Sequence, residues 1–134
     1  MVRQINVFME NRLGRLYEIC RLLGENGINI RGFSVADMAD FGLLRLIVDD
    51  PDRAKKILTE ADFPVSEAKI LVVNVPDRPG GLAEVLRVLT EAGLSVEYTY
   101  LVANTRVAFA FDDNEKAAEV LKEAGFELIE LENL

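Results

Sequence analysis

The sequence predicts an α+β fold made of two copies of one small unit, each with the order strand, helix, strand, strand, helix, strand. Two observations lead to this prediction. An internal repeat aligns residues 11–30 with residues 77–96 without a gap. Apolar patterns of strand and helix period also follow one another in the same order in both halves. The order is that of the ferredoxin-like fold, in which one antiparallel sheet carries two helices on one face.

The repeat is carried by identical residues at equivalent positions. Eight pairs recur across the first aligned segment: Arg12/Arg78, Gly14/Gly80, Leu16/Leu82, Glu18/Glu84, Arg21/Arg87, Leu23/Leu89, Glu25/Glu91 and Gly27/Gly93. After a slip of three residues, the match resumes at Asp49, which aligns with Asp112, and continues to Phe63, which aligns with Phe126. Duplication of one unit explains this match, so we expect two domains, residues 1–67 and residues 68–134.

The elements of the first repeat follow from local patterns. They are expected as a strand at 2–9, a helix at 14–26, strands at 28–35 and 43–48, a helix from residue 50 and a short strand at 63–67. Gly27 stands where a left-handed residue ends a helix. Asp50 is a capping residue and Pro51 suits the first helical position, so the second helix begins there.

The second repeat carries the same signals. Its elements are expected as a strand at 69–75, a helix at 80–92, strands at 95–103 and 106–111, a helix at 114–124 and a closing strand at 126–131. No low-complexity linker separates the repeats, so the chain should run almost straight from one into the next. Because units of this size bury only about 60% of their unfolded surface, we expect the halves to pack tightly and to share sheet edges.

Composition narrows the possible functions. The net charge of -8 over 134 residues disfavours nucleic acid and anionic membranes as partners. No apolar run approaches the roughly 20 residues of a membrane span, and residues 1–6 do not read as a signal peptide, so a cytoplasmic protein is expected. The chain has no histidine and one cysteine, Cys20. We therefore expect no catalytic triad, no enzyme activity, no metal site and no cofactor.

The junction between the first strand and first helix of each repeat is the candidate binding site. It comprises Asn11, Arg12, Leu13, Gly14 and Arg15 in the first repeat, and Asp77, Arg78, Pro79, Gly80 and Gly81 in the second. Glycine permits close approach of the backbone to a ligand, and free N–H groups at a helix start favour a carboxylate. Residue types alone leave an alternative open, in which Asn11 and Asp77 only cap helices and the glycines only allow close packing.

The motifs at these junctions resemble those of ACT domains, the regulatory domains of amino-acid metabolism. They read Asn-Arg-Leu-Gly-Arg-Leu with Gly-Ile-Asn-Ile, and Asp-Arg-Pro-Gly-Gly-Leu with Gly-Leu-Ser-Val. Residues 10–14 are similar to the serine-sensing ACT domain of phosphoglycerate dehydrogenase, where two asparagines hold the effector across a domain interface. The resemblance implies that Asn11 and Asn29, with its neighbour Ile30, bind the ligand. Asp77 and Ser95 replace the two asparagines in the second repeat, which departs from the pattern.

The expected function is that of a regulatory sensor. Residues 36–45 also look like those of stand-alone tandem ACT proteins, which carry no enzyme domain. We expect a homodimer that binds a small amino acid or related carboxylate between ACT-type units and acts on a metabolic enzyme. The alternative is a structural or regulatory subunit that docks on an enzyme without binding a ligand.

Three other features each have a purely structural explanation as well as a functional one. Cys20 is assigned to a buried helix face rather than to reactivity. Tyr98 and Tyr100 alternate along one strand and belong either to the core or to a pocket. A group of aspartates is assigned to turns and caps in preference to a cation site; its members are Asp37, Asp40, Asp49, Asp50 and Asp52.

Overall fold

The computed structural model describes the backbone of residues 1–134 and all side chains except those of residues 37 and 38. Asp37 of the aspartate group therefore lies outside the described side chains. The chain divides into two compact units, Arg3–Ala68 and Lys69–Leu134, the latter together with Met1–Val2. The domain limits 1–67 and 68–134, and the packing of the halves on each other, stay predictions. No helix of the described chain is long and apolar enough to cross a membrane.

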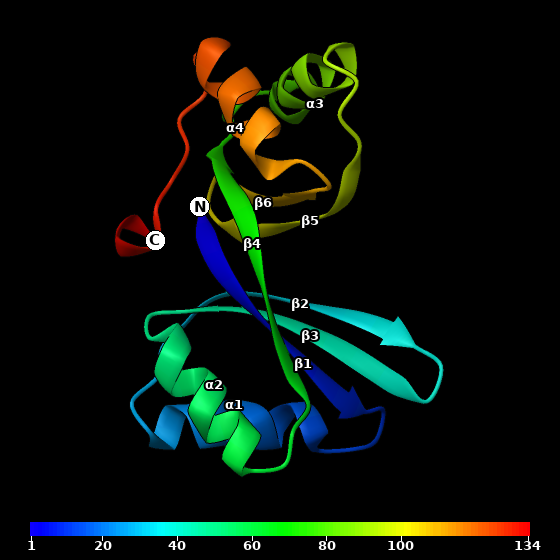
Figure 1. The fold of residues 1–134 in the computed structure, drawn as a ribbon, viewed down its shortest axis with the longest axis vertical. Coiled ribbons are helices and arrows are strands. Elements are labelled where there is room, and N and C mark those ends of the chain that lie inside the picture. The colour runs from blue at the N-terminus through cyan, green and yellow to red at the C-terminus, as the bar shows by residue number, and fades with distance from the viewer. The chain divides into compact units, whose positions relative to one another are not determined.

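The first unit contains four strands and two helices (Figure 1). In chain order they are β1 (Val2–Glu10), α1 (Arg15–Glu25), β2 (Ile30–Met38), β3 (Phe41–Val48), α2 (Pro51–Glu60) and the beginning of β4 (Val65–Asn74). The strand order is β2-β3-β1-β4, and β3 is antiparallel to both of its neighbours. Both helices cover the same face of this sheet.

The core of the first unit lies between the sheet and its helices. Ile5 pairs with Leu46 and Val7 with Leu44, which places these four side chains on the face that α1 and α2 cover. The helices complete the core with the predicted apolar faces, which include Ile19, Leu23, Ala54 and Leu58. Asp50 caps α2 by accepting a hydrogen bond from the Arg53 N–H at 3.2 Å, as predicted. Cys20 is half-buried, and burial raises the pKa of its thiol.

The second unit repeats this plan. Its elements are the end of β4, then α3 (Gly81–Glu91), β5 (Val96–Ala103), β6 (Arg106–Phe111), α4 (Asn114–Glu123) and a 3-10 helix, η1 (Leu131–Asn133). The strand order is β4-β6-β5, with β6 antiparallel to both neighbours. Both helices again cover one face of the sheet (Figure 1). The predicted α+β, ferredoxin-like fold in two tandem repeats is therefore confirmed.

The end of the second repeat differs from the prediction. The predicted closing strand at 126–131 is reduced to a single bridge between Leu128 and Val73, flanked by hydrogen bonds from Asn74 N–H to Glu127 and from Ile129 N–H to Val72. Residues 131–133 then form the 3-10 helix. The apolar alternation of Phe126 and Leu128 breaks at Ile129, where two apolar residues follow one another, so the pattern supports pairing over only a few residues.

Candidate functional site

The first candidate junction, between β1 and α1, is an exposed turn fixed mostly by backbone hydrogen bonds. The Asn11 N–H donates to the Asp40 carbonyl at 3.0 Å, and the Asn11 side-chain amide donates to the Ala39 carbonyl at 3.4 Å. Gly14 caps α1 in a left-handed conformation with φ of 86°, and none of the described side chains caps the helix. Gly14, not Asn11, is therefore the cap residue, and the N–H of Arg15, the first helical residue, already donates to the Arg12 carbonyl at 3.3 Å.

The positive side chains of this junction already have carboxylate partners. Arg12 Nε lies 2.9 Å from Glu10, and Arg15 lies 2.9 Å from Glu18 and 3.7 Å from Glu10. The Arg15 guanidinium also stacks on the Phe63 ring, with Cζ 5.0 Å from the ring centroid. Its Nε is buried without a hydrogen-bond partner among the described atoms. Leu13, in contrast, is fully exposed beside Gly14. The Arg15 side chain is therefore held by ion pairs of its terminal guanidinium nitrogens and by its contact with the Phe63 ring.

Asn29 and Ile30 lie at the other end of the first unit's sheet. Asn29 exchanges hydrogen bonds with Asp49: its N–H donates to the Asp49 carboxylate at 3.0 Å, and its carbonyl accepts from the Asp49 N–H at 3.1 Å. Ile30 pairs with Val48, whereas Glu10, next to Asn11, pairs with Phe41. Seven residues of β3 separate these registers, from 41 to 48, or about 23 Å along the strand. The structure thus does not bring Asn11 and Asn29 together within one unit.

The second candidate junction, between β4 and α3, is a tighter turn. The Arg78 N–H donates to the Pro76 carbonyl at 3.0 Å, and Gly80 caps α3 with φ of 82°. A Cβ at Gly81 would lie 1.9 Å from the Pro76 carbonyl oxygen, so only glycine fits there. Arg78 donates hydrogen bonds to Glu84, with its Nη2 atom 2.9 and 2.7 Å from the two carboxylate oxygens. Asp77 and Pro79 are exposed, and Gly80, not Asp77, is the cap.

Ser95 lies just before β5, at the opposite end of the second unit from Asp77. β5 begins with Val96 opposite Phe111, whereas Asn74, near Asp77, pairs with Arg106 at the other end of β6. The candidate residues of the second repeat are therefore divided between two ends of the sheet, as in the first repeat. Tyr98 and Tyr100 are half-buried.

Two hollows border the second junction. One, of about 850 Å³, is lined by Asn74, Val75, Pro76, Asp77, Arg78, Glu84, Arg87, Val88, Thr105, Ala124, Gly125, Phe126 and Glu127. The other, of about 480 Å³, is more apolar and is lined by Val75, Pro76, Asp77, Arg78, Pro79, Leu82, Leu101, Asn104, Thr105 and Val107. The candidates Asp77 and Arg78 line both, so the turn that carries them separates two openings.

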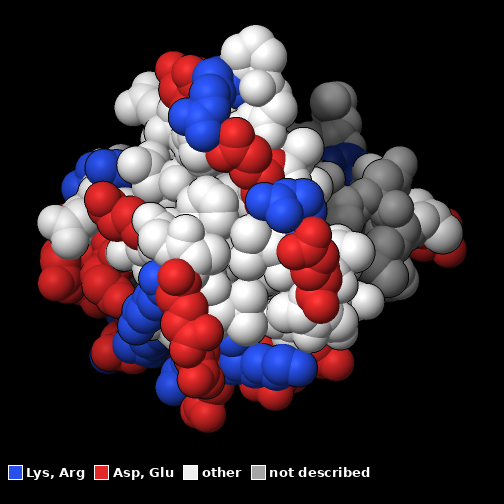
Figure 2. All heavy atoms as spheres, turned by 90° about the horizontal axis from the view of Figure 1, so that it is seen from above, with Lys and Arg blue, Asp and Glu red and all other residues white. Residues whose placement is uncertain are grey.

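The face that carries α3 and α4 has mixed charge. Figure 2 shows that Lys and Arg side chains lie beside Asp and Glu on this face and do not gather in one patch. Arg87 and Glu91, one helical turn apart on α3, are 3.2 Å apart. Among the residues with described side chains, no group of three His, Cys, Asp or Glu side chains is placed to hold a metal ion.

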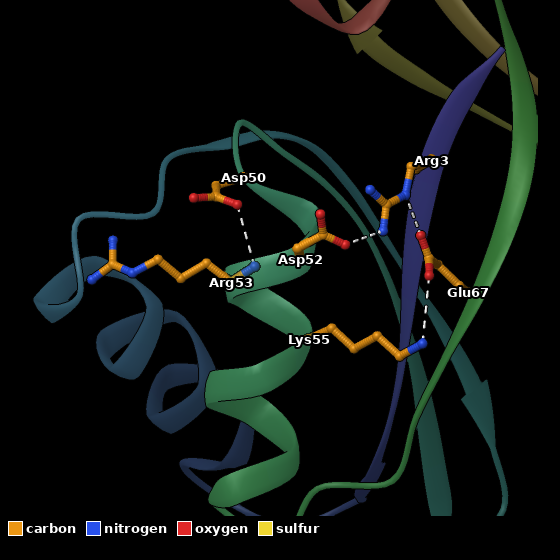
Figure 3. A network of polar contacts seen from close by, with 6 residues as sticks. All are labelled: Arg3, Asp50, Asp52, Arg53, Lys55 and Glu67. Carbon is orange, nitrogen blue, oxygen red and sulfur yellow. Dashed lines mark hydrogen bonds and ion pairs between the residues drawn. The ribbon is translucent and has the colours of Figure 1, made fainter.

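A polar network that the sequence analysis missed joins β1, α2 and β4 in the first unit (Figure 3). Arg3 pairs with Asp52 at 2.6 Å and also with Glu67, and Lys55 lies 3.5 Å from Glu67. The hydrogen bond from Arg3 lowers the pKa of Asp52 and also that of Glu67. Arg3 and Glu67 are 64 residues apart, so no local pattern marks this pair.

Comparison with known proteins supports the fold and identifies the family. The model of the ACT domain pair family matches residues 1–134. Protein BT0572 from Bacteroides thetaiotaomicron is 38% identical, with a TM-score of 0.91 over 96% of this chain and 91% of that one. The ligand-free regulatory subunit of aspartate kinase from Thermus thermophilus is 16% identical, with a TM-score of 0.68 over 92% of each chain, a likeness that shows the shared fold.

A shorter match covers part of the chain. The UPF0237 protein NMA1909 of Neisseria meningitidis is 31% identical over 71 residues, which is 53% of this chain and 79% of that protein. The family match spans the whole chain, and the structure shows two copies of the predicted unit. The chain therefore belongs to the ACT domain pair family.

Proposed function

We propose that this protein is a non-catalytic, cytoplasmic regulator that binds a small amino acid or related carboxylate at a site shared by two copies of the chain. The single observation that carries the proposal is the separation of Asn11 from Asn29 by about 23 Å of β3. The resemblance to effector-binding ACT domains assigns both asparagines to one ligand. One unit cannot supply both, so a second unit must supply one of them.

The exposed edge of the first unit suits such an assembly. β2 is the outermost strand in the order β2-β3-β1-β4. Phe33 and Val35 on β2 are 58% and 46% exposed, and their partners Leu46 and Leu44 place them on the helix-covered side of the sheet. Tyr17 on α1 is 69% exposed. An apolar edge strand is prone to pair with another strand, and a two-fold dimer uses the same patch twice.

Antiparallel pairing of the β2 strands of two copies would bring Asn29 of one copy to the same end of the sheet as Asn11 of the other. The start of β2 in one copy then meets the end of β2 in the other, so Asn29 of one copy and the Asn11 junction of its partner lie at the same end of the joined sheet. The N–H groups that follow Arg15 in the first turn of α1 offer a place for the ligand carboxylate. The side-chain oxygens of Asn11 and Asn29 offer acceptors for its ammonium group.

Regulation follows from linkage. A ligand that contacts both copies favours the dimer and is in turn bound more tightly by it. A metabolic enzyme that docks on only one of the two states would thereby respond to the ligand. The second candidate, a subunit that docks on an enzyme without a ligand, uses the same apolar edge and differs only in having no effector.

A thermal melt against the twenty amino acids and related acids tests the proposal, with a reporter dye because the chain has no Trp. A ligand at 100 times its dissociation constant adds about 2.7 kcal/mol and raises Tm by several degrees. Asn11→Ala and Asn29→Ala should each abolish the shift. Asn133→Ala, an exposed asparagine far along the chain, is the control and should keep it. A panel in which no compound raises Tm would favour the subunit without a ligand.

A further inference from the structure

The first helices of the two repeats begin with different residues, Arg15 in α1 and Gly81 in α3. Arg15 of the first repeat aligns with Gly81 of the second, because both stand 66 residues apart within the ungapped segment. Arg15 carries a long cationic side chain that is mostly buried, with 21% of it exposed. Gly81 carries none, and the 1.9 Å contact that a Cβ would make with Pro76 prevents any residue other than glycine there.

The hollow is lined by the equivalents of the residues that Arg15 contacts in the first repeat. Arg15 touches three residues there: Glu10, Glu18 and the ring of Phe63. Their equivalents in the second repeat are Pro76, Glu84 and Phe126, and all three line the hollow of about 850 Å³. Phe63 is buried at 5% exposure under the guanidinium, whereas Phe126 is only half-buried. The first repeat thus shows a guanidinium held among the equivalent residues.

The lining of the hollow is suited to a cation. Three carboxylates contribute, Asp77, Glu84 and Glu127, against two arginines. Arg78 is held by Glu84, and Arg87 pairs with Glu91. No ion pair is found for Asp77 or Glu127 among the residues with described side chains.

The ring of Phe126 adds a second preference for positive charge. A guanidinium over an aromatic ring gains a favourable electrostatic interaction with it, as the Arg15 contact shows in the first repeat. Asn74 and Thr105, hydrogen-bonded to each other at 2.7 Å, supply neutral polar atoms on the wall formed by the strands. The volume falls within the usual range for small-molecule sites.

We propose that this hollow binds a small molecule that ends in a guanidinium group, which takes the position of the Arg15 side chain in the first repeat. The guanidinium stacks on Phe126 and pairs with Glu127, since Arg78 already pairs with Glu84. Free arginine is the amino acid of this class, and its α-carboxylate would face Arg87 or Arg78. The inference goes beyond the proposed function, since it needs neither Asn11, Asn29 nor a second copy of the chain.

The test is an NMR titration of the full chain with three related ligands. L-Arginine has both the guanidinium and the α-carboxylate, agmatine has the guanidinium alone, and L-citrulline has the shape of arginine without the cationic group. We expect arginine and agmatine to shift the backbone amides of Asn74, Thr105 and Gly125, and citrulline to bind at least about tenfold more weakly. Equal binding of arginine and agmatine would assign recognition to the guanidinium alone. Tighter binding of arginine than of agmatine would show that its α-carboxylate is also recognised.

Two variants locate the site. Glu127→Gln should weaken arginine binding about fivefold, and Phe126→Leu about threefold. Glu119→Gln, an exposed carboxylate on α4 that does not line the hollow, is the matched control and should change nothing. Asn11→Ala should also leave arginine binding intact, which separates this inference from the proposed function. The inference is overturned if citrulline binds as well as arginine, if the shifted amides lie elsewhere, or if Glu127→Gln binds arginine like the wild type.

Discussion

The two repeats pack the same junction in different ways. In the first, Arg15 reaches over Phe63 and pairs with a glutamate of α1. In the second, Gly81 has no side chain, and Arg78 of the preceding turn pairs with the equivalent glutamate. The glutamate keeps an arginine partner in both repeats, but only the first repeat covers its phenylalanine. A duplicated unit can therefore keep its fold while one copy opens a hollow.

The largest effect is expected from Gly81→Ala. The new methyl group would lie 1.9 Å from the Pro76 carbonyl oxygen, so the turn before α3 must move. We expect a loss of about 3 kcal/mol in the free energy of unfolding, at the upper end of overpacking effects. Urea denaturation measures it. Gly24→Ala in α1 is the control, because a Cβ there meets nothing within 4 Å and alanine should stabilise the helix by up to about 1 kcal/mol.

Arg15→Ala should make the first repeat resemble the second, because Phe63 would no longer be covered by a guanidinium. The variant loses a guanidinium–ring contact and a partly buried ion pair, which should lower stability by about 2 kcal/mol. Agmatine should restore part of the lost Tm, because it can enter the space that the side chain vacated. Arg12→Ala, which removes an exposed pair, should cost less than about 1 kcal/mol. Agmatine that raised the Tm of both variants equally would contradict the equivalence of the two places.

The edge strands of the two units provide a third comparison. Val35→Lys places a charge on the exposed apolar side of β2 and should weaken dimerisation by about tenfold, measured by sedimentation. Leu101→Lys makes the same change on β5, the outer strand of the second unit, where Leu101 is 63% exposed. It should leave the dimer unchanged. If Leu101→Lys dissociated the dimer and Val35→Lys did not, the interface would lie on β5 of the second unit and not on β2.

The polar network around Arg3 should give the smallest effect, and one that depends on pH. The pKa values of Asp52 and Glu67 lie below their ordinary values of 3.8 and 4.5, because Arg3 donates hydrogen bonds to both carboxylates. The network therefore stabilises the fold above about pH 4.5 and loses this contribution as the pH falls through the lowered values. Arg3→Gln should be less stable than the wild type near pH 6, and the difference should narrow as the pH falls below about 4.5, so that the two converge at low pH.

The second repeat supplies the contrast for this network. Lys69 and Glu115 stand where the first repeat has Arg3 and Asp52, and Glu130, equivalent to Glu67, pairs with the N-terminal ammonium of Met1 at 3.3 Å. Lys69→Gln should therefore show no such convergence. An Arg3→Gln difference that stays constant from pH 6 to pH 3 would mean that these carboxylates do not depend on Arg3.

The order of elements could be predicted because it rests on local patterns that occur twice. Asp50 before Pro51 and Gly27 after α1 are local signals, and the structure confirms both. The prediction of a closing strand at 126–131 was wrong. A short apolar run favours an extended segment, but it does not show whether that segment forms a continuous row of hydrogen bonds with a neighbouring strand.

The candidate site was harder to predict, because its geometry depends on contacts between distant residues. The resemblance to ACT domains assigned Asn11 and Asn29 to one ligand across a domain interface, and strand direction puts them at opposite ends of the sheet within one unit. Phe126 and Glu127, which line the larger hollow, were not predicted at all. The sequence signal was the pairing of Arg15 with Gly81, a long cationic residue against glycine between the identical pairs Gly14/Gly80 and Leu16/Leu82.

The central claim, a site shared by two copies, is tested most directly by mixing two inactive variants. Once the ligand is known, Asn11→Ala and Asn29→Ala chains are exchanged in equal amounts and binding is measured by calorimetry. In a two-fold dimer, half of the dimers are mixed and each of these keeps one intact site, so about a quarter of the wild-type sites should return. No recovery of binding in the mixture, with exchange of chains verified, would contradict the shared site.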